Sequence, residues 1–590
     1  MEVKRLFDIF AYQQANYPKS DALVHKSNGV WEKHSTDSVM EASDAIALGL
    51  LQLGLQPGDM IAIMSDNSFE WTLTDLGILK MGGINVPIYP TNTPEDITFI
   101  LNHAEVKCIF VQTQDMLDKV LKIKDKIPTL QHVFGFNNLN GATYYKDMKV
   151  NPNETGRYSL KEIQDKVKPK QLATIIYTSG TTGQPKGVML SHENIVSNVL
   201  SSMDRLPVTK EHIALTFLPL SHIFERMILY LYTYAGISIY YAESIEKIGD
   251  NLKEVRPHVF TAVPRLLEKV FDKVQANGAA AGGLKAKIFA WASKVALAWE
   301  PDGQNGFFYG IKHSIAEKLV YSKIRAKAGL DRVITTCSGS AALQPRLCRF
   351  FNAIGVCLQE GYGLTETSPV ISVSGFRPGE LKIGHVGTVI NNGTIKIAED
   401  GEICYKGPNV MMGYYKNEEM TRTVIDADGY FHTGDIGVLD PKGFLRITDR
   451  KKEMWKTSGG KYIAPQVIEN KLKESPFIEQ VVVVGDNEKF PGALIVPSFA
   501  YLYDWLESEG VKPPRDMPAA VVAMDKVKAK INEEVERLNA NFGKWEQIKK
   551  FELLPRDMTI DTGELTPTMK PKRKFINEKY KAEIEKIYAS

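Results

Sequence analysis

A glycine- and hydroxyl-rich segment, Tyr177 to Gly187, combines three kinds of group that bind phosphate. Glycines let the backbone approach an anion closely, hydroxyl side chains donate hydrogen bonds, and one lysine supplies a positive charge. The common phosphate loop places its lysine directly after a glycine, whereas Pro185 precedes the lysine here. The segment therefore predicts a phosphate site of another type. Its candidate residues are Thr178, Ser179, Gly180, Thr181, Thr182, Gly183, Lys186 and Gly187.

A flexible connector is the ordinary interpretation of a stretch rich in Gly, Ser and Thr. Two features argue against it here. The apolar run from Leu172 to Tyr177 indicates a buried strand that leads into the segment, and a Pro-Lys-Gly sequence is embedded near its end. We therefore expect the segment to contact a nucleotide.

A second candidate lies in Glu360 to Glu366. Gly361 and Gly363 predict a tight turn, and Thr365 places a hydroxyl beside the Glu366 carboxylate. A carboxylate that only caps the start of a helix is the structural alternative for Glu366.

Five segments, in the same order along the chain, resemble the signature motifs of the adenylate-forming superfamily. This superfamily contains acyl-CoA synthetases, luciferases and peptide-synthetase adenylation domains. Agreement in order over such a length argues against chance. The segments are Tyr177–Gly187, Gly361–Glu366, Tyr430–Asp435, Asp449-Arg450 with Ser458–Gly460, and Lys570.

The resemblance implies that ATP binds between these motifs and that Glu366 holds Mg²⁺. Thr365 would contact phosphate, Tyr362 would stack on the adenine, and Asp435 with Arg450 would bind the ribose hydroxyls. Without the family pattern, a core tyrosine and a common Thr-Gly-Asp turn are the alternatives. The implied nucleotide-binding residues beyond the first segment are Gly339, Ser340, Ala341, Glu360, Gly361, Tyr362, Gly363, Thr365, Asp435 and Arg450.

Lys570 is the catalytic lysine that the resemblance implies, beside Thr178, Glu366 and His222. The Pro- and Lys-rich sequence around Lys570, taken alone, predicts a solvated tail. By resemblance, the small domain brings Lys570 into the main cleft for adenylation and turns away to admit the thiol of CoA. Lys452 occupies a hinge position where many relatives carry Asp, although lysine hinges also occur.

Gly459 and Gly460 suit a turn close to the pantetheine arm of CoA. An inter-domain turn without catalytic meaning is the alternative.

The segment Leu218 to Arg226 resembles the equivalent part of long-chain fatty acyl-CoA synthetases, as does the extra segment between Arg265 and Leu330. This implies a long-chain fatty acid as substrate, with His222 near its carboxylate or at the tunnel entrance. A hydrogen-bonded structural histidine is the alternative. Each buried methylene is worth about 0.8 kcal/mol, so the preferred chain length cannot be read from the sequence.

Two other functions stay open. An acyl carrier protein could replace CoA as acceptor, because both present the same phosphopantetheine thiol. The chain could also be a nucleotide-binding regulatory protein without turnover. The presence of all five charged motif residues, Lys186, Glu366, Asp435, Arg450 and Lys570, argues against that alternative. The leading prediction is an ATP-dependent long-chain fatty acid:CoA ligase.

The composition of the 590 residues sets limits on location and partners. There are 72 basic and 70 acidic side chains, which argues against a nucleic-acid binder with a broad basic surface. Five cysteines without a Cys-x-x-Cys pair indicate neither a disulfide framework nor a zinc site, so a reducing cytoplasm is expected. No secretion leader or spanning segment is evident. The sequence gives no oligomeric state.

Strand and helix patterns alternate from Asp59 to Val111, with strands expected at Met60–Met64 and Ile84–Ile88, which indicates a parallel sheet. We expect an α/β fold with a large N-terminal domain, residues 1–448, of parallel or mixed sheets layered with helices. A small mobile α+β domain, residues 449–590, would follow a hinge near 450–452. The polar stretch 137–159 is expected to be irregular, and Ser191 to cap a helix.

Apolar residues alternate with lysines between Gly282 and Leu330, for example Trp291, Val295 and Leu297 beside Lys294. A helix packed on the core with solvated lysines is the favoured interpretation. The alternative is peripheral contact with the inner face of the membrane.

Overall fold

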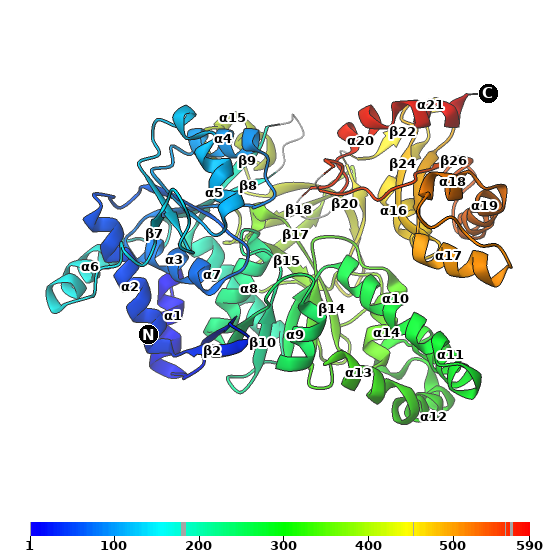
Figure 1. Ribbon diagram of the computed structural model, residues 1–590, viewed down its shortest axis with the longest axis horizontal. Coiled ribbons are helices and arrows are strands. Elements are labelled where there is room, and N and C mark those ends of the chain that lie inside the picture. Colours follow the sequence, from blue (N-terminus) through cyan, green and yellow to red (C-terminus); the bar gives the residue numbers. More distant parts are fainter. Residues whose placement is uncertain (1, 179–183, 452, 561, 567–569, 590) are drawn as a thin grey trace. The chain divides into compact units, whose positions relative to one another are not determined.

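The computed structural model describes residues 2–178, 184–451, 453–560, 562–566 and 570–589 (Figure 1). The chain divides into two compact units. Unit 1 contains Met1–Lys396, Cys404–His432 and Asp440–Leu445, and unit 2 contains Ile397–Ile403, Thr433–Leu439 and Arg446–Ser590. The expected boundary at 448/449 and the hinge near 450–452 stay predictions, and Lys452 lies outside the described residues.

An eight-stranded sheet forms one layer of unit 1. The expected strands at Met60–Met64 and Ile84–Ile88 are confirmed, and they pair in parallel. In spatial order the strands are β19 (Gly413–Tyr414), β9 (Lys186–Ser191), β8 (Leu172–Thr178), β4 (Ile84–Ile88), β3 (Met60–Met64), β5 (Cys108–Val111), β6 (His132–Gly135) and β7 (Thr143–Tyr144).

A nine-stranded sheet forms a second layer of unit 1. Its central strands β10, β12, β13 and β14 run in parallel, so their carboxyl ends meet at one edge. In spatial order the strands are β16 (Thr388–Val389), β15 (Val370–Val373), β14 (Leu358–Gly363), β13 (Thr335–Ser338), β12 (Val259–Ala262), β10 (Ile213–Thr216), β11 (Ser238–Tyr241), β1 (Leu23–Ser27) and β2 (Val30–His34).

Helices cover both sheets of unit 1. They are α1 (Leu6–Asn16), α2 (Thr36–Gln52), α3 (Phe69–Lys80), α4 (Pro94–His103), α5 (Gln114–Leu121), α6 (Glu154–Lys166), α7 (His192–Ser202), α8 (Ile223–Tyr234), α9 (Ile248–Val255), α10 (Pro264–Ala280), α11 (Gly283–Leu297), α12 (Gly306–Ala316), α13 (Ser322–Ala328), α14 (Pro345–Ala353) and α15 (Glu418–Val424). Short turns are the 3₁₀ segments η1 (Lys124–Lys126), η2 (Met203–Arg205), η3 (Pro301–Gly303) and η5 (Thr365–Thr367), and the π turn η4 (Glu317–Tyr321).

The buried side chains show why the layers form. Along β3, Ile61 and Ile63 belong to one core cluster and Ala62 and Met64 to another, because successive side chains point to opposite faces of a strand. The first cluster also contains Ala214 of β10 together with residues of α1, α3, α7 and α8. These four helices therefore lie between the two sheets, and strands buried on both faces account for the near-continuous apolar runs in the sequence.

Unit 2 contains a small α+β core, as expected. In β24, Val481 and Val483 pack on one face and Val482 and Val484 on the other. The strands are β22 (Trp455–Lys456), β23 (Tyr462–Ile463), β24 (Ile478–Val484), β25 (Gly492–Pro497) and β26 (Lys550–Leu553). The helices are α16 (Pro465–Leu472), α17 (Phe499–Ser508), α18 (Pro518–Ala523), α19 (Asp525–Asn539), α20 (Arg573–Lys579) and α21 (Lys581–Tyr588).

A four-stranded sheet contributes residues to both units, in the order β17 (Thr394–Ile397), β18 (Glu402–Lys406), β20 (Phe431–Leu439) and β21 (Leu445–Arg450).

The predicted cap at Ser191 is confirmed, because its hydroxyl accepts the Asn194 backbone N–H at 3.1 Å. The expectation of an irregular stretch over 137–159 is wrong in its second half. Helix α6 begins at Glu154 because the Asn153 side chain caps it, accepting the Gly156 N–H at 2.7 Å. None of the helices in the described residues combines the length and apolar character that crossing a bilayer requires.

Candidate functional site

Several candidate residues follow the carboxyl ends of parallel strands in the nine-stranded sheet. His222 lies in the loop after β10, Ser340 in the loop after β13, and Glu366 in the turn η5 after β14. Ligands of open α/β sheets bind at this edge. The topology therefore places on one edge three residues that span 144 positions of the sequence, from His222 to Glu366.

Gly361 and Gly363 do not form the expected tight turn, since both belong to strand β14. Glycine matters at these positions because it has no side chain. A Cβ atom on Gly363 would lie 1.9 Å from the carbonyl oxygen of Pro369, and one on Gly361 would lie 3.4 Å from the sulfur of Cys337. The close approach of the antiparallel neighbour β15 requires glycine at 363.

The loop after β13 also depends on its backbone. Ser340 has a φ of 69°, in the left-handed region, and a Cβ atom on Gly339 would lie 3.2 Å from the Phe224 ring of helix α8. Ala341 follows as an exposed residue. The predicted adenine-binding loop is thus packed against the helix that His222 begins.

Strands β8 and β9 position the two ends of the phosphate-binding segment. They pair antiparallel, with Thr178 opposite Lys186 and Tyr177 opposite Gly187. A Cβ atom on Gly187 would approach Ile175 to 2.8 Å, so this glycine serves close strand pairing. The predicted residues between the two ends, Ser179, Gly180, Thr181, Thr182 and Gly183, lie outside the described residues.

Tyr414 connects two of the predicted residues and was not predicted from the sequence. Its strand β19 pairs with β9, which carries Lys186. The Lys186 ammonium lies 5.5 Å from the centre of the Tyr414 ring, and the Tyr414 hydroxyl donates to Glu366 Oε1 at 2.9 Å. Burial and the Glu366 carboxylate both raise the pKa of Tyr414, so it stays a donor. The residue pattern around Tyr414 in the sequence does not indicate this contact.

Glu366 suits a hard divalent cation. It is half-buried, its carboxylate has one oxygen oriented by Tyr414, and its backbone carbonyl accepts the Met411 N–H at 2.8 Å. Mg²⁺ in proteins is bound by one or two carboxylates together with substrate phosphates and water. The donor chemistry of Glu366 fits that arrangement.

Glu360 and Tyr362 lie on β14, and Glu360 is buried. Burial raises the pKa of Glu360 to about 8, while a hydrogen bond with Cys348 opposes the shift. The carboxyl group is therefore protonated at neutral pH and can donate a hydrogen bond. Tyr362 is half-buried in the same strand, opposite Ser372 of β15. Thr365 begins η5.

His222 is the N-cap of helix α8, where its Nδ1 accepts the Phe224 N–H at 3.1 Å. The neutral imidazole therefore carries its proton on Nε2. The next polar residues anchor this helix inside the protein. Glu225 accepts hydrogen bonds from Thr216 and Thr261, and burial raises its pKa to about 7.

Arg226, in the same helix α8, makes buried contacts with two other elements. It is fully buried, pairs with Asp75 of α3 at 2.5 Å, and donates to Thr174 of β8 at 2.8 Å. The helix that carries His222 is thereby fastened to the strand that leads into the phosphate-binding segment. Removing one partner of such a buried pair leaves an uncompensated charge, which costs about 3 to 5 kcal/mol.

In unit 2, the structure brings together Asp435 of β20 and Arg450 of β21. The Arg450 Nε donates to Asp435 Oδ1 at 3.0 Å, and Asp435 is almost fully buried. The neighbouring Asp449 has its pKa raised to about 7 by burial, against a backbone hydrogen bond from Arg450. An oriented carboxylate beside a guanidinium has the donors and acceptors to bind a diol.

Lys570 lies at the base of a short hairpin in unit 2, where Leu565 pairs with Pro571. The backbone of Lys570 exchanges two hydrogen bonds with Thr566, at 2.8 and 3.0 Å. Three residues later, Arg573 is paired with Glu453 at 3.0 Å and with Glu469 at 2.8 Å. These contacts hold the described part of the segment in place, while Pro571, Lys572 and Lys574 are exposed to solvent as the sequence taken alone predicts.

Gly459 and Gly460 form the turn of the β22–β23 hairpin, as a turn-forming pair should. The Gly460 N–H donates to the Thr457 carbonyl at 2.8 Å, and Gly460 has a φ of 76° that favours glycine.

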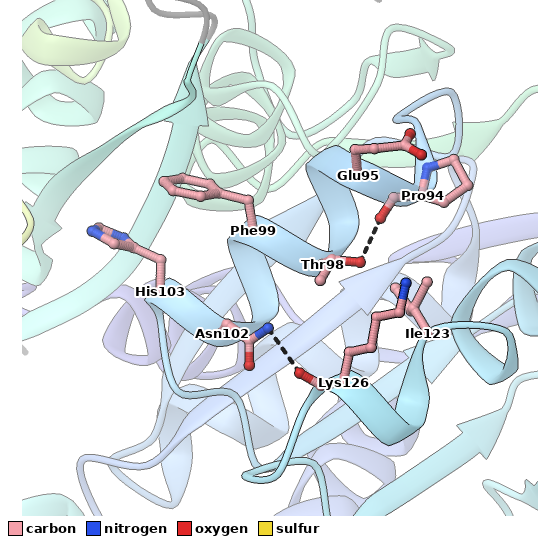
Figure 2. Close-up of a pocket in the computed structure, with 8 residues that line it drawn as sticks. All are labelled: Pro94, Glu95, Thr98, Phe99, Asn102, His103, Ile123 and Lys126. Carbon is pink, nitrogen blue, oxygen red and sulfur yellow. Dashed lines mark hydrogen bonds between the residues drawn. The ribbon is translucent and has the colours of Figure 1, made fainter.

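An open hollow of about 660 Å³ lies along helix α4 (Figure 2). Phe99 and His103 line it, and the His103 Nδ1 is hydrogen-bonded to the Tyr177 hydroxyl at 2.8 Å. Among the described residues, those lining the hollow include none predicted for the site. They are Pro94, Glu95, Thr98, Phe99, Asn102, His103, Ile123 and Lys126.

Comparison with known proteins decides the family. A model of the AMP-binding enzyme family matches residues 10–415, and a model of the AMP-binding enzyme C-terminal domain matches residues 454–590. The chain belongs to the AMP-binding enzymes. The adenylate-forming resemblance is thereby confirmed, and residues 416–453 lie between the two matched ranges.

Among relatives of this AMP-binding enzyme, the long-chain-fatty-acid–CoA ligase FadD15 of Mycobacterium bovis is 37% identical over 95% of this chain and 93% of its own. Human long-chain-fatty-acid–CoA ligase 1 is 32% identical over 96% of this chain and 84% of its own. The fold resembles the A domain of a carboxylic acid reductase from Segniliparus rugosus in complex with AMP and a carboxylic acid. That similarity has a TM-score of 0.76 at 21% identity and covers 100% of this chain and 95% of the other.

Proposed function

We propose that this AMP-binding enzyme is an ATP-dependent long-chain fatty acid:CoA ligase. It forms acyl-AMP and pyrophosphate, and then acyl-CoA and AMP. The observation that carries the proposal is identity of 37% to a long-chain-fatty-acid–CoA ligase across nearly the whole of both chains. The placement of Lys186, Tyr414 and Glu366 supports it, because the chemistry needs fixed positive charge and oriented donors around a triphosphate.

In the first half-reaction, the fatty carboxylate attacks the α-phosphorus of ATP and pyrophosphate leaves. Lys186 and Thr178 lie opposite each other at the end of the paired strands β8 and β9, where they can bind the phosphates. Mg²⁺, when bound at Glu366, neutralises phosphate charge. Asp435 and Arg450 would hold the ribose, while Gly339 to Ala341 and Tyr362 would hold the adenine.

We assign Lys570 to the transition state of adenylation, where it would neutralise charge that develops on the α-phosphate. In the second half-reaction, the CoA thiol displaces AMP from the acyl group. Gly459 and Gly460 would border the pantetheine arm, and Lys452 would be the hinge. His222 would lie near the acyl carboxylate, a role compatible with its capping of helix α8.

Product analysis tests this proposal. Purified protein, ATP, Mg²⁺ and hexadecanoic acid are incubated with CoA or with holo-acyl carrier protein, and thioesters are separated by chromatography. We expect acyl-CoA to form much faster than acyl carrier protein thioester. Turnover of acetate or benzoate without turnover of dodecanoic to octadecanoic acids would overturn the long-chain assignment. A cytoplasmic location and peripheral membrane contact stay predictions.

A further inference from the structure

Helix α12 and the π turn η4 that continues it carry five large apolar side chains that face solvent. Phe307 and Phe308 are each 79% exposed, and Ile311, Ile315 and Leu319 are 45%, 46% and 45% exposed. We call these five residues the α12 face. Contiguous exposed apolar surface of this kind marks a site of protein or membrane contact.

The orientation of α12 is fixed by its other side. The Tyr309 hydroxyl donates to the Val295 carbonyl of α11 at 2.9 Å, and the His313 Nε2 donates to the Ala353 carbonyl of α14 at 2.7 Å. Phe308, Ile311 and Ile315 recur at three- and four-residue spacing, so they share one face of the helix. The side of α12 that carries Tyr309 and His313 is therefore anchored to the protein, and a different side exposes the apolar residues to solvent.

The neighbouring helix α11 behaves differently. The sequence favoured a core-packed helix between Gly282 and Leu330, with membrane contact as the alternative. In α11 the favoured interpretation is right, because Val295 and Ala296 are buried and Ile288, Phe289 and Trp291 pack against the core. The exposed apolar surface belongs instead to α12, which packs beside α11 (Figure 1).

Positive charge predominates in the segment of the chain that contains the α12 face. The segment from residue 283 to 327 holds eight basic side chains against three acidic ones, in a chain whose total net charge is only +2. Two of the three acids are paired, Glu317 with Arg325 at 2.5 Å and Glu300 with Arg349 at 2.6 Å. Lys312 and Lys318 are exposed beside the apolar stripe, within reach of the same surface.

We infer that the α12 face docks this protein on the surface of an anionic phospholipid bilayer. Apolar side chains that enter the acyl boundary, flanked by lysines that meet lipid phosphates, are how an amphipathic helix binds in the plane of a membrane. A second copy of this chain is a poorer occupant, because it would bring the same positive charge against itself. The inference does not depend on the proposed ligase activity.

Vesicle flotation with the full-length protein tests the inference. We compare vesicles of phosphatidylglycerol and phosphatidylcholine with vesicles of phosphatidylcholine alone, at low and high salt. The wild type is expected to float with the anionic vesicles and to be released by salt. The double variant Phe307→Ser/Phe308→Ser should lower the partition coefficient by about tenfold or more, since two apolar side chains no longer enter the bilayer.

Two further variants make the test specific. Ile245→Ser changes a side chain that is 70% exposed elsewhere in unit 1, and it should bind like the wild type. Lys312→Gln/Lys318→Gln should weaken binding to anionic vesicles by about fivefold per lysine and leave binding to neutral vesicles unchanged. Unaltered thermal melting of all variants shows that they fold.

Three results would overturn the inference. The first is that the wild type does not float with anionic vesicles, and the second is that the phenylalanine variant floats as well as the wild type. The third is that sedimentation shows a dimer, that the phenylalanine variant abolishes this dimer, and that neither protein binds vesicles; this result would assign the α12 face to a second copy.

Discussion

The backbone of Lys570 is hydrogen-bonded to Thr566, and the role proposed for Lys570 depends on the positive charge of its side chain. Lys570→Ala should lower the rate of adenylation by about 10²-fold or more, as loss of a preorganised electrostatic contact does. Thioester formation from supplied acyl-adenylate should survive. The two half-reactions are measured separately by pyrophosphate release and by acyl-CoA formation.

Lys574→Ala is the matched control, because Lys574 is an exposed lysine four residues further along the chain. It should leave both half-reactions unchanged. Equal losses in both half-reactions for Lys570→Ala would contradict the assigned role.

Tyr414 donates a hydrogen bond to the Glu366 carboxylate at 2.9 Å. Hydrogen bonds to charged groups contribute about 1.5 to 3 kcal/mol, so Tyr414→Phe should lower kcat/KM by about tenfold or more and raise the Mg²⁺ concentration needed for half-maximal rate. Tyr415→Phe is the control next in sequence. An unchanged Mg²⁺ dependence in Tyr414→Phe would show that the hydroxyl does not orient Glu366.

Glu360 makes stability depend on pH. Its pKa is about 8 in the folded protein and 4.5 in the ordinary state, so the folded state holds an extra proton between these values. The unfolded state binds fewer protons in this window, and the free energy of unfolding therefore falls as pH rises from 4.5 to 8. Glu360→Gln should flatten that fall, as measured by Tm against pH. A parallel curve for the variant would show that Glu360 is not the titrating group.

At the scale of single residues, the sequence was informative where residue type alone carries the chemistry. The pairing of Asp435 with Arg450 was expected and is present at 3.0 Å. Tyr414 was missed because its importance arises from the pairing of β19 with β9, two strands separated by more than two hundred residues. The roles of the site residues stay predictions until the variants are measured.

Among the secondary-structure elements, β14 and β15 depend most on one small residue. A Cβ atom on Gly363 would lie 1.9 Å from the Pro369 carbonyl oxygen, which is backbone and cannot turn aside. Gly363→Ala should therefore lower the free energy of unfolding by about 3 kcal/mol or more and displace η5 with Glu366. Denaturant unfolding measures the first effect and the rate of adenylation the second.

Gly249→Ala in helix α9 is the matched control. Nothing lies within 4 Å of a Cβ atom at that position, and alanine favours a helix by up to about 1 kcal/mol over glycine. It should be neutral or stabilising. A Gly363→Ala protein as stable as the wild type would show that β15 can move away without cost.

Elements with a clear periodicity were well predicted, and those decided by packing were not. Strands β3 and β4 have the expected bounds because β3 is a continuous apolar run and β4 is apolar except for Asn85. The turn expected at Gly361 and Gly363 is a strand, since glycine there serves close approach rather than a positive φ. In α11 and α12, apolar and basic residues alternate alike, and only the tertiary contacts separate the buried helix from the exposed one.

At the scale of the whole molecule, the order of motifs along the chain was sufficient to predict the family and the layered α/β fold. The residues proposed for the nucleotide site occur in both units of the chain. Lys186 and Glu366 belong to unit 1, whereas Asp435, Arg450 and Lys570 belong to unit 2. The proposed activity therefore needs both units to act on one nucleotide.

Exchange of labelled pyrophosphate into ATP is the most direct measurement of that central claim, because it requires reversible acyl-adenylate formation and nothing later. With Mg²⁺ and hexadecanoic acid, and without CoA, we expect rapid exchange that disappears when the acid is omitted. Exchange that is absent with the acid present, in protein that is folded, would contradict the account of this chain as a fatty acid-activating enzyme.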